Sequence, residues 1–169
     1  MMNKKLIYFY ISYLLFFFLI LLFYELSAFL TVSTFPTPFP LFYTPLTPEI
    51  FLGIQFLGIP LLFIILFLTS REGYVIGLLV VYFTFLVIFY LFPNIYALFS
   101  LALVGIGLFA SVIPNCISRL SKVLWGISSL YYVMIIVNYI FSPSLQFYPI
   151  FIIPSVIASG IEIMKVRQF

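Results

Sequence analysis

Histidine and aspartate are absent from this chain of 169 residues, and cysteine occurs once. Haem, copper and catalytic zinc sites usually depend on imidazole ligands, and carboxylates complete many of them. We therefore expect no metal and no other cofactor to be held by this chain alone. The single cysteine, Cys116, excludes an intrachain disulfide. It falls in a connection that we predict to be cytoplasmic, where a free thiol is stable.

Charged residues are also scarce. They make up 7% of the chain, against roughly 25% in soluble domains, whereas 66% of the chain is hydrophobic. So few charges cannot cover a soluble globule, and the sequence therefore predicts a protein whose solvent is lipid. The net charge of +3 comes from cations that stand at the ends of apolar runs. This pattern indicates topology signals beside an anionic leaflet, and we expect no nucleic-acid partner.

Six apolar runs are long enough to cross a bilayer, which takes about 20 helical residues. Backbone groups in lipid must be bonded within their own segment, so we predict an all-α integral membrane protein with six transmembrane helices. One transmembrane domain covers residues 1–169, and short connections predict an up-and-down bundle. The predicted spans are residues 6–30, 49–69, 74–92, 96–113, 123–141 and 147–164.

The cations occupy alternate ends of these runs. Cationic side chains near helix ends remain cytoplasmic, so the pattern predicts a multi-pass protein of the cell (plasma) membrane with both termini in the cytoplasm. The first run, residues 6–30, exceeds the 7–15-residue apolar core of a cleaved signal peptide. We expect it to be retained as a helix. The cations are Lys4, Lys5, Arg71, Arg119, Lys122, Lys165 and Arg167.

Residues 31–48 form one long predicted outer connection, which is rich in proline and aromatic residues. Proline favours extended, polyproline-like backbone, and the aromatic side chains are too apolar to remain in water. We expect this loop to lie over the outer end of its own bundle, on the membrane interface, or against a partner subunit.

Glu25 lies inside the apolar run of the first span, with no cation on its side of the membrane. An ionisable residue within a span is a functional hypothesis by default. Glu25 is interpreted as an interfacial carboxylate, with a contact to a cation of another subunit as the alternative. It has a depth similar to that of Glu49, so a paired-carboxylate site for an ion or proton is a third interpretation. Glu162 has a simpler explanation, because Lys165 follows it by three positions on the same helix face.

Two amides, Gln55 and Asn138, fall at membrane depth. Amides are costly to expose to lipid, so we expect both to point between helices, as interhelical contacts or along a polar path. Pro60 and Pro154 interrupt spans two and six and predict kinks. Matched breaks of this kind also occur at transporter sites.

Three pairs of small residues keep a four-residue spacing, which lets helix backbones approach closely in membranes. Span four is also rich in small residues, so we expect it at the bundle centre or in a contact between subunits. The pairs are Gly73 and Gly77, Gly107 and Ser111, and Ser155 and Ser159.

No nucleotide-binding, zinc, haem or nucleophile motif occurs in the chain. We therefore expect a protein that is not itself an enzyme. It would be a structural or accessory subunit of a larger membrane complex, such as a respiratory complex, and would pack against cofactor-bearing subunits, lipid or quinone. Its predicted contacts are the 31–48 loop and span four. The alternative is a small six-helix transporter or channel for a neutral or hydrophobic solute. A lipid-modifying enzyme would depend on Glu25 and Glu49.

Overall fold

The computed structural model describes residues 5–30, 44–45, 50, 53–70 and 73–168. Within these ranges the protein consists of helices, together with one short antiparallel strand pair. A helix satisfies its own backbone groups, which lipid cannot do. The helices are α1 (Leu6–Leu30), the π-helix η1 (Ile54–Gly58), α3 (Ile59–Ser70), α4 (Gly73–Leu91), α5 (Ile95–Val112), the 3₁₀-helix η2 (Ile113–Asn115), α6 (Arg119–Ser128), α7 (Leu130–Phe141) and α8 (Pro149–Gln168).

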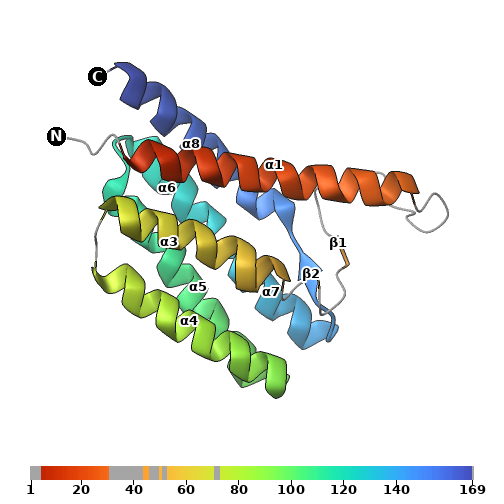
Figure 1. Cartoon of the computed structure of the whole chain (residues 1–169). Helices are drawn as coiled ribbons and strands as arrows, with labels where there is room; N and C mark the ends of the chain where they lie inside the picture. Colours follow the sequence, from red (N-terminus) through yellow and green to blue (C-terminus); the bar gives the residue numbers. More distant parts are fainter. Residues whose placement is uncertain (1–4, 31–43, 46–49, 51–52, 71–72, 169) are drawn as a thin grey trace.

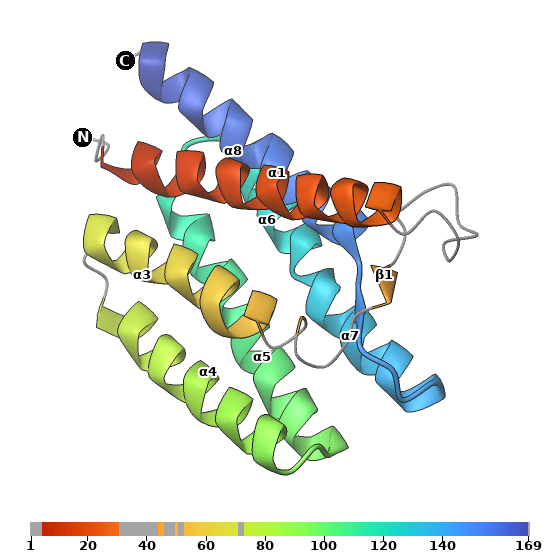
Figure 2. The same ribbon diagram turned by 45° about the vertical axis from the view of Figure 1, so that its right-hand side comes forward.

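The helices form a closed bundle in which neighbours in the sequence pack against each other (Figure 1). α1 packs on α3, α3 on α4, and α4 on α5. α5 in turn contacts α6 and α7, and α6 packs closely along α8. α8 returns to α1, which lies between α8 and α3 in both ribbon views (Figure 2). These contacts form a ring of helices that runs from α1 through α3, α4, α5, α6 and α8 back to α1.

Four helical segments of the described chain are long and apolar enough to cross a membrane. They are Gly73–Leu91, Ile95–Asn115, Arg119–Phe141 and Pro149–Val166. Two shorter apolar helices, Leu6–Leu22 and Ile59–Thr69, accompany them. The structure is thus that of a helical membrane protein. Each of these segments overlaps one of the six predicted spans.

Span two differs from a simple predicted helix. Its described part begins as the π-helix η1 and becomes regular only in α3. Pro60 stands in the first turn of α3, where its missing N–H and fixed backbone angle are tolerated. The change of helix type therefore coincides with the predicted proline break.

Span five is divided into α6 and α7 at Ser129. The Ser129 hydroxyl donates to the Gly126 carbonyl at 2.6 Å, and the Ser129 N–H donates to the same carbonyl at 3.2 Å. Serine competes with the regular helical ladder through such local bonds. The sequence pattern predicted one unbroken helix here, because the span holds no proline.

A short strand pair, β1 (Thr44–Pro45) and β2 (Gln146–Phe147), lies at the end of the bundle away from the start of α1 (Figure 1). Thr44 pairs with Phe147 and Pro45 with Gln146, which fastens part of the long predicted loop to the α7–α8 connection (Figure 1). The rest of that loop lies outside the described residues.

The start of α1 and the end of α8 lie at the same end of the bundle as the start of α6 (Figure 1). The α4–α5 turn lies at the other end, where the Asn94 side chain accepts a hydrogen bond from the N–H of Ala97 at 2.8 Å and caps α5. The end with the start of α1 is called the terminal end below, and the end with the α4–α5 turn is called the turn end.

Candidate functional site

The most polar surface inside the bundle is the contact between α6 and α8. It is called the serine seam below, and every side chain of it is fully buried. Small hydroxyl side chains let two helices approach closely and bond across the gap in lipid. This explains why α6 and α8 pack so tightly. The serine seam consists of Ser121 and Ser128 on α6 and Ser155, Ser159 and Glu162 on α8.

Glu162 closes the serine seam at the terminal end. One carboxylate oxygen accepts the N–H of Ile117 at 2.9 Å, and the other accepts the N–H of Ser118 at 3.0 Å. Ser118 is the N-cap of α6, so the negative group stands at the positive end of that helix. Glu162 therefore joins α8 to the α5–α6 connection, a contact that the same-face pairing with Lys165 did not predict.

The middle of the serine seam joins two irregular helix segments. The Ser155 N–H donates to the Ser128 hydroxyl at 2.8 Å, one residue before the break at Ser129. Ser155 also follows Pro154, which cannot donate a backbone bond. The residue before the α6–α7 break is thus hydrogen-bonded to the residue that follows Pro154 in α8.

Tyr13 of α1 extends this polar contact to a third helix. Its hydroxyl lies 2.6 Å from the Ser155 hydroxyl, which itself donates to the Ile152 carbonyl at 2.6 Å. The Ser159 hydroxyl donates to the Ser155 carbonyl at 2.8 Å. Because the Ser155 proton is used on Ile152, Tyr13 acts as the donor to Ser155.

Trp125 fills the centre of the bundle, and it is the only tryptophan of the chain. Its ring centroid lies 4.8 Å from that of Tyr13, 6.0 Å from Phe9 and 5.8 Å from Phe109. Aromatic pairs at these spacings add to the stability from burial. Within the described residues, the Trp125 indole N–H and the Ser121 hydroxyl, one turn earlier, have no hydrogen-bond partner.

A second buried polar group surrounds Gln55 and is called the glutamine cluster. The Gln55 amide nitrogen donates to the Tyr131 hydroxyl at 2.7 Å. The Gln55 carbonyl oxygen accepts the hydroxyl of Tyr82 and, at 3.4 Å, that of Tyr132. Gln55 lies on η1, Tyr82 on α4, and both other tyrosines on α7. The cluster therefore ties three segments together at the depth where sequence analysis placed an interhelical amide.

Two glycines allow aromatic rings to lie against a backbone inside the bundle. A methyl group on Gly105 would come within 2.3 Å of the Tyr132 ring, and one on Gly58 within 2.2 Å of the Phe16 ring. Any larger residue at these positions forces a ring to move. Gly105 lies on α5, and its ring partner belongs to the glutamine cluster.

The residues predicted for close helix packing differ in their exposure and in what lies opposite them. Gly73 and Gly77 are exposed on α4, and a methyl group added to either would meet nothing within 4 Å. A methyl group on Gly107 would make ordinary contact with Leu78 at 3.4 Å. Ser111 is buried, and its hydroxyl donates within its own helix to Leu108 at 2.6 Å.

The predicted polar residue Asn138 lies at the turn end, away from the bundle centre. Its amide donates to the Ser144 carbonyl at 2.9 Å and to the Ser144 hydroxyl at 3.3 Å, so it holds the α7–α8 connection. Glu25 belongs to α1, but its side chain lies outside the described residues. Glu49 also lies outside them.

Cys116 is buried at the terminal end, beside Glu162 and α1. Its sulfur lies 3.8 Å from the Tyr10 hydroxyl and 3.5 Å from the Val112 carbonyl. Burial raises the pKa of the Cys116 thiol to about 11, with the Glu162 carboxylate acting in the same direction. A protonated thiol is a poor nucleophile and a poor metal ligand, so the geometry favours a packing role for this residue.

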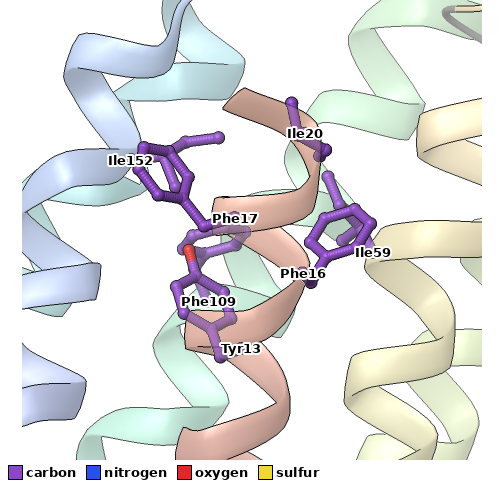
Figure 3. A pocket seen from close by; sticks show the side chains of 7 residues that line it. All are labelled: Tyr13, Phe16, Phe17, Ile20, Ile59, Phe109 and Ile152. Atoms are coloured by element: carbon purple, nitrogen blue, oxygen red, sulfur yellow. The ribbon is translucent and has the colours of Figure 1, made fainter. Parts of the chain in front are cut away.

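A small cavity of about 10 Å³ lies beside Tyr13, between α1, α3, α5 and α8 (Figure 3). A single water molecule needs roughly this much space, but also several polar partners. The side chains around the cavity are aromatic and aliphatic, and the one hydroxyl among them is bonded to Ser155. Over the described ranges, no group of three His, Cys, Asp or Glu residues could hold a metal ion.

Comparisons of the chain with protein families, with curated proteins and with solved structures find no match.

Proposed function

We propose that this protein is a non-catalytic subunit of a larger membrane complex, with six membrane crossings and both termini in the cytoplasm. The observation that supports this most strongly is the glutamine cluster. Gln55 is an amide within a predicted span, and both polar atoms of its side chain bond to tyrosine hydroxyls of the same chain. The amide thus locks helices together and is not presented to a solute.

The outer face of α4 gives this proposal a specific surface. Gly73 and Gly77 are exposed there, together with Tyr74, Ile76 and Val80. A small-residue pair at this spacing is typical of helix contacts in membranes, and α4 does not use it within the described chain. A helix of another subunit fits this face.

The proposal is tested by purification in mild detergent, with the accompanying chains identified by mass spectrometry. We expect constant proportions of at least one other membrane protein. Gly77→Leu should release that partner without loss of the fold, because a methyl group at this position meets open space. Gly160→Leu on α8 is the matched control, since its position is also open within the chain.

A solitary chain, or a symmetric assembly of this chain alone that is unaffected by Gly77→Leu, contradicts the subunit proposal. Loss of a partner from both glycine variants would show a general folding defect instead of a contact through α4.

The second candidate is a small transporter, and the irregular helices favour it. η1 carries the buried Gln55, and the break at Ser129 and the turn at Pro154 flank the bond between Ser128 and Ser155. Such interruptions are often found at substrate sites. Ser121→Cys, in a Cys116→Ser background, separates the two functions. Reaction of this buried position with a membrane-impermeant thiol reagent favours a water-filled path, whereas no reaction favours the packed subunit.

A further inference from the structure

Three cation-bearing helix ends meet at the terminal end of the bundle. Lys5 immediately precedes α1, Arg119 and Lys122 occupy the start of α6, and Lys165 lies in the last turn of α8. Lys5, Arg119 and Lys122 are exposed, and Lys165 is half-buried. These ends belong to helices that pack on one another, since α8 contacts both α6 and α1.

Two sets of contacts hold these helix ends beside one another. The bonds from Glu162 to the backbone of Ile117 and Ser118 place the last turns of α8 beside the first turn of α6. Lys165 therefore stands one helical turn from the residue that holds the α6 cap. The Tyr10–Cys116 contact places the first turns of α1 against the same connection. The four cations thus lie at the ends of three helices that pack on one another, and this part of the terminal end is called the basic corner.

Among the described residues, Glu162 is the acidic side chain beside the start of α6, and its hydrogen bonds go to the backbone. Glu162 is fully buried, and each of its carboxylate oxygens already accepts a backbone N–H. Its charge is directed at the start of α6 and away from the surface. Glu162 therefore bonds to the backbone and not to the exposed side chains of Arg119 and Lys122.

Exposed aliphatic side chains alternate with these cations. Leu120 is 57% exposed and Val123 is 59% exposed on α6, and Met164 is 61% exposed on α8. Cations beside an apolar surface match a molecule that carries an anionic group on a hydrocarbon chain. Basic pockets between transmembrane helices bind lipid headgroups in this way.

We propose that the basic corner binds the headgroup phosphate of one anionic phospholipid. Arg119 and Lys122 bind the phosphodiester oxygens, since guanidinium and ammonium groups donate several charge-assisted hydrogen bonds to phosphate. Lys165 and Lys5 add charge from the neighbouring helix ends. Leu120 and Val123 contact the first part of an acyl chain.

The test uses the full-length protein reconstituted in vesicles of equal parts phosphatidylglycerol and phosphatidylcholine. Native mass spectrometry after mild detergent extraction counts the lipids that remain bound. We expect one phosphatidylglycerol to be retained in preference to phosphatidylcholine. The double substitution Arg119→Gln with Lys122→Gln should lower that preference at least about fivefold, the size expected from removing one surface cation.

Two further variants serve as controls. Arg71→Gln removes a cation from the α3–α4 connection, which is remote in sequence from the basic corner, and should leave the preference unchanged. Arg119→Lys with Lys122→Arg keeps both charges and should retain it. Because all of these substitutions are at exposed or connecting positions, the amount of folded protein should equal that of the wild type.

Equal retention of the two lipids contradicts the proposal, as does an equal loss of preference in the Arg71→Gln variant. Retention of inorganic phosphate in place of lipid, with the same dependence on Arg119 and Lys122, would identify a site for a free anion and would also overturn it.

Discussion

At the scale of single residues, buried polar groups hold the helices together, and their chemistry is set by where the bundle places them. Gln55, Ser155 and Glu162 each bond to a different segment of the chain. In lipid, such bonds contribute on the order of 1 kcal/mol each. Their larger effect is on specificity, because an unpaired polar group in the same position costs more than the bond contributes.

Replacement of Gln55 by Leu should destabilise the protein by about 1–3 kcal/mol, because the hydroxyls of Tyr82, Tyr131 and Tyr132 lose a common partner. Unfolding in mixed micelles with increasing denaturing detergent measures the change. Thr84→Val is the control, since the exposed Thr84 hydroxyl bonds only within α4, to Val80. Equal stability of the two variants would show that the glutamine cluster contributes nothing.

The reaction of Cys116 with a maleimide should depend on pH in an unusual way. Thiolate is the reactive form, and burial raises the pKa of this thiol to about 11, whereas a free cysteine has a value of about 8.5. The rate should therefore continue to rise about tenfold per pH unit from pH 7 to pH 10. An exposed thiol, introduced by Leu120→Cys in a Cys116→Ser background, should level off near pH 9. A plateau of Cys116 at that same pH would show that the thiol is solvated.

Glu162→Gln should increase the rate of Cys116 labelling at fixed pH. The amide offers one acceptor oxygen, so the N–H of Ile117 or of Ser118 is left unbonded and the α5–α6 connection loosens around the thiol. Loss of the carboxylate charge acts in the same direction, because it lowers the pKa of the Cys116 thiol. We expect an increase of about tenfold, equivalent to about 1.4 kcal/mol, which is within the range of a hydrogen bond to a charged group. Lys165→Gln is the control on the same helix turn. An unchanged rate in Glu162→Gln would show that this carboxylate does not hold the connection.

At the scale of helices, close approach is decided by what lies opposite each small residue. Sequence spacing singled out Gly107, yet a methyl group there meets Leu78 at 3.4 Å, which is ordinary contact. Gly105, two positions earlier, faces the Tyr132 ring far more closely. The two positions differ by about 200° around a helix, so only the packing partner distinguishes them.

Gly105→Ala should therefore lower stability by about 1–3 kcal/mol, the usual effect of overpacking a core. The added methyl group displaces the Tyr132 ring and, with it, one member of the glutamine cluster. The matched substitution Gly107→Ala should not destabilise the protein and should raise its stability by up to about 1 kcal/mol, since alanine favours helix over glycine and its methyl group makes only ordinary contact with Leu78. Thermal unfolding monitored by circular dichroism in detergent compares them, and the reverse order would place the tight α5 contact at Gly107.

The sequence predicted the helical elements well because lipid imposes long apolar runs with polar interruptions. The helices begin and end within a few residues of the predicted spans 74–92 and 96–113. Pro60 predicted an irregularity in span two, but not that it takes the form of a π-helix, and the break at Ser129 was not predicted at all. Likewise, Glu162 has its partners 44 and 45 positions away. Spacing along one helix could only suggest Lys165 in their place.

At the scale of the whole molecule, the arrangement of charge separates the two ends of the bundle. Lys5, Arg119 and Lys122 are exposed at the terminal end. The turn end carries exposed aromatic side chains, which in membrane proteins gather at the lipid–water interface. Tyr96 is 81% exposed and Phe141 is 85% exposed there. The molecule therefore has the polarity along its axis that an oriented membrane protein requires.

This polarity predicts opposite labelling of the two ends. In a Cys116→Ser background, Lys122→Cys should react with a membrane-impermeant maleimide only after the cytoplasmic side is opened. Asn94→Cys, in the exposed α4–α5 turn, should react in intact cells. Cations resist translocation, so the side reached by Lys122→Cys also fixes the side of both termini.

A third variant, Ser144→Cys in the α7–α8 connection, tests the number of crossings. If α6 and α7 together cross the bilayer, Ser144→Cys reacts from the same side as Asn94→Cys. Reaction of Ser144→Cys and Lys122→Cys from the same side would mean that the broken segment Arg119–Phe141 does not span the bilayer. The six-crossing arrangement would then have to be replaced by one with fewer spans.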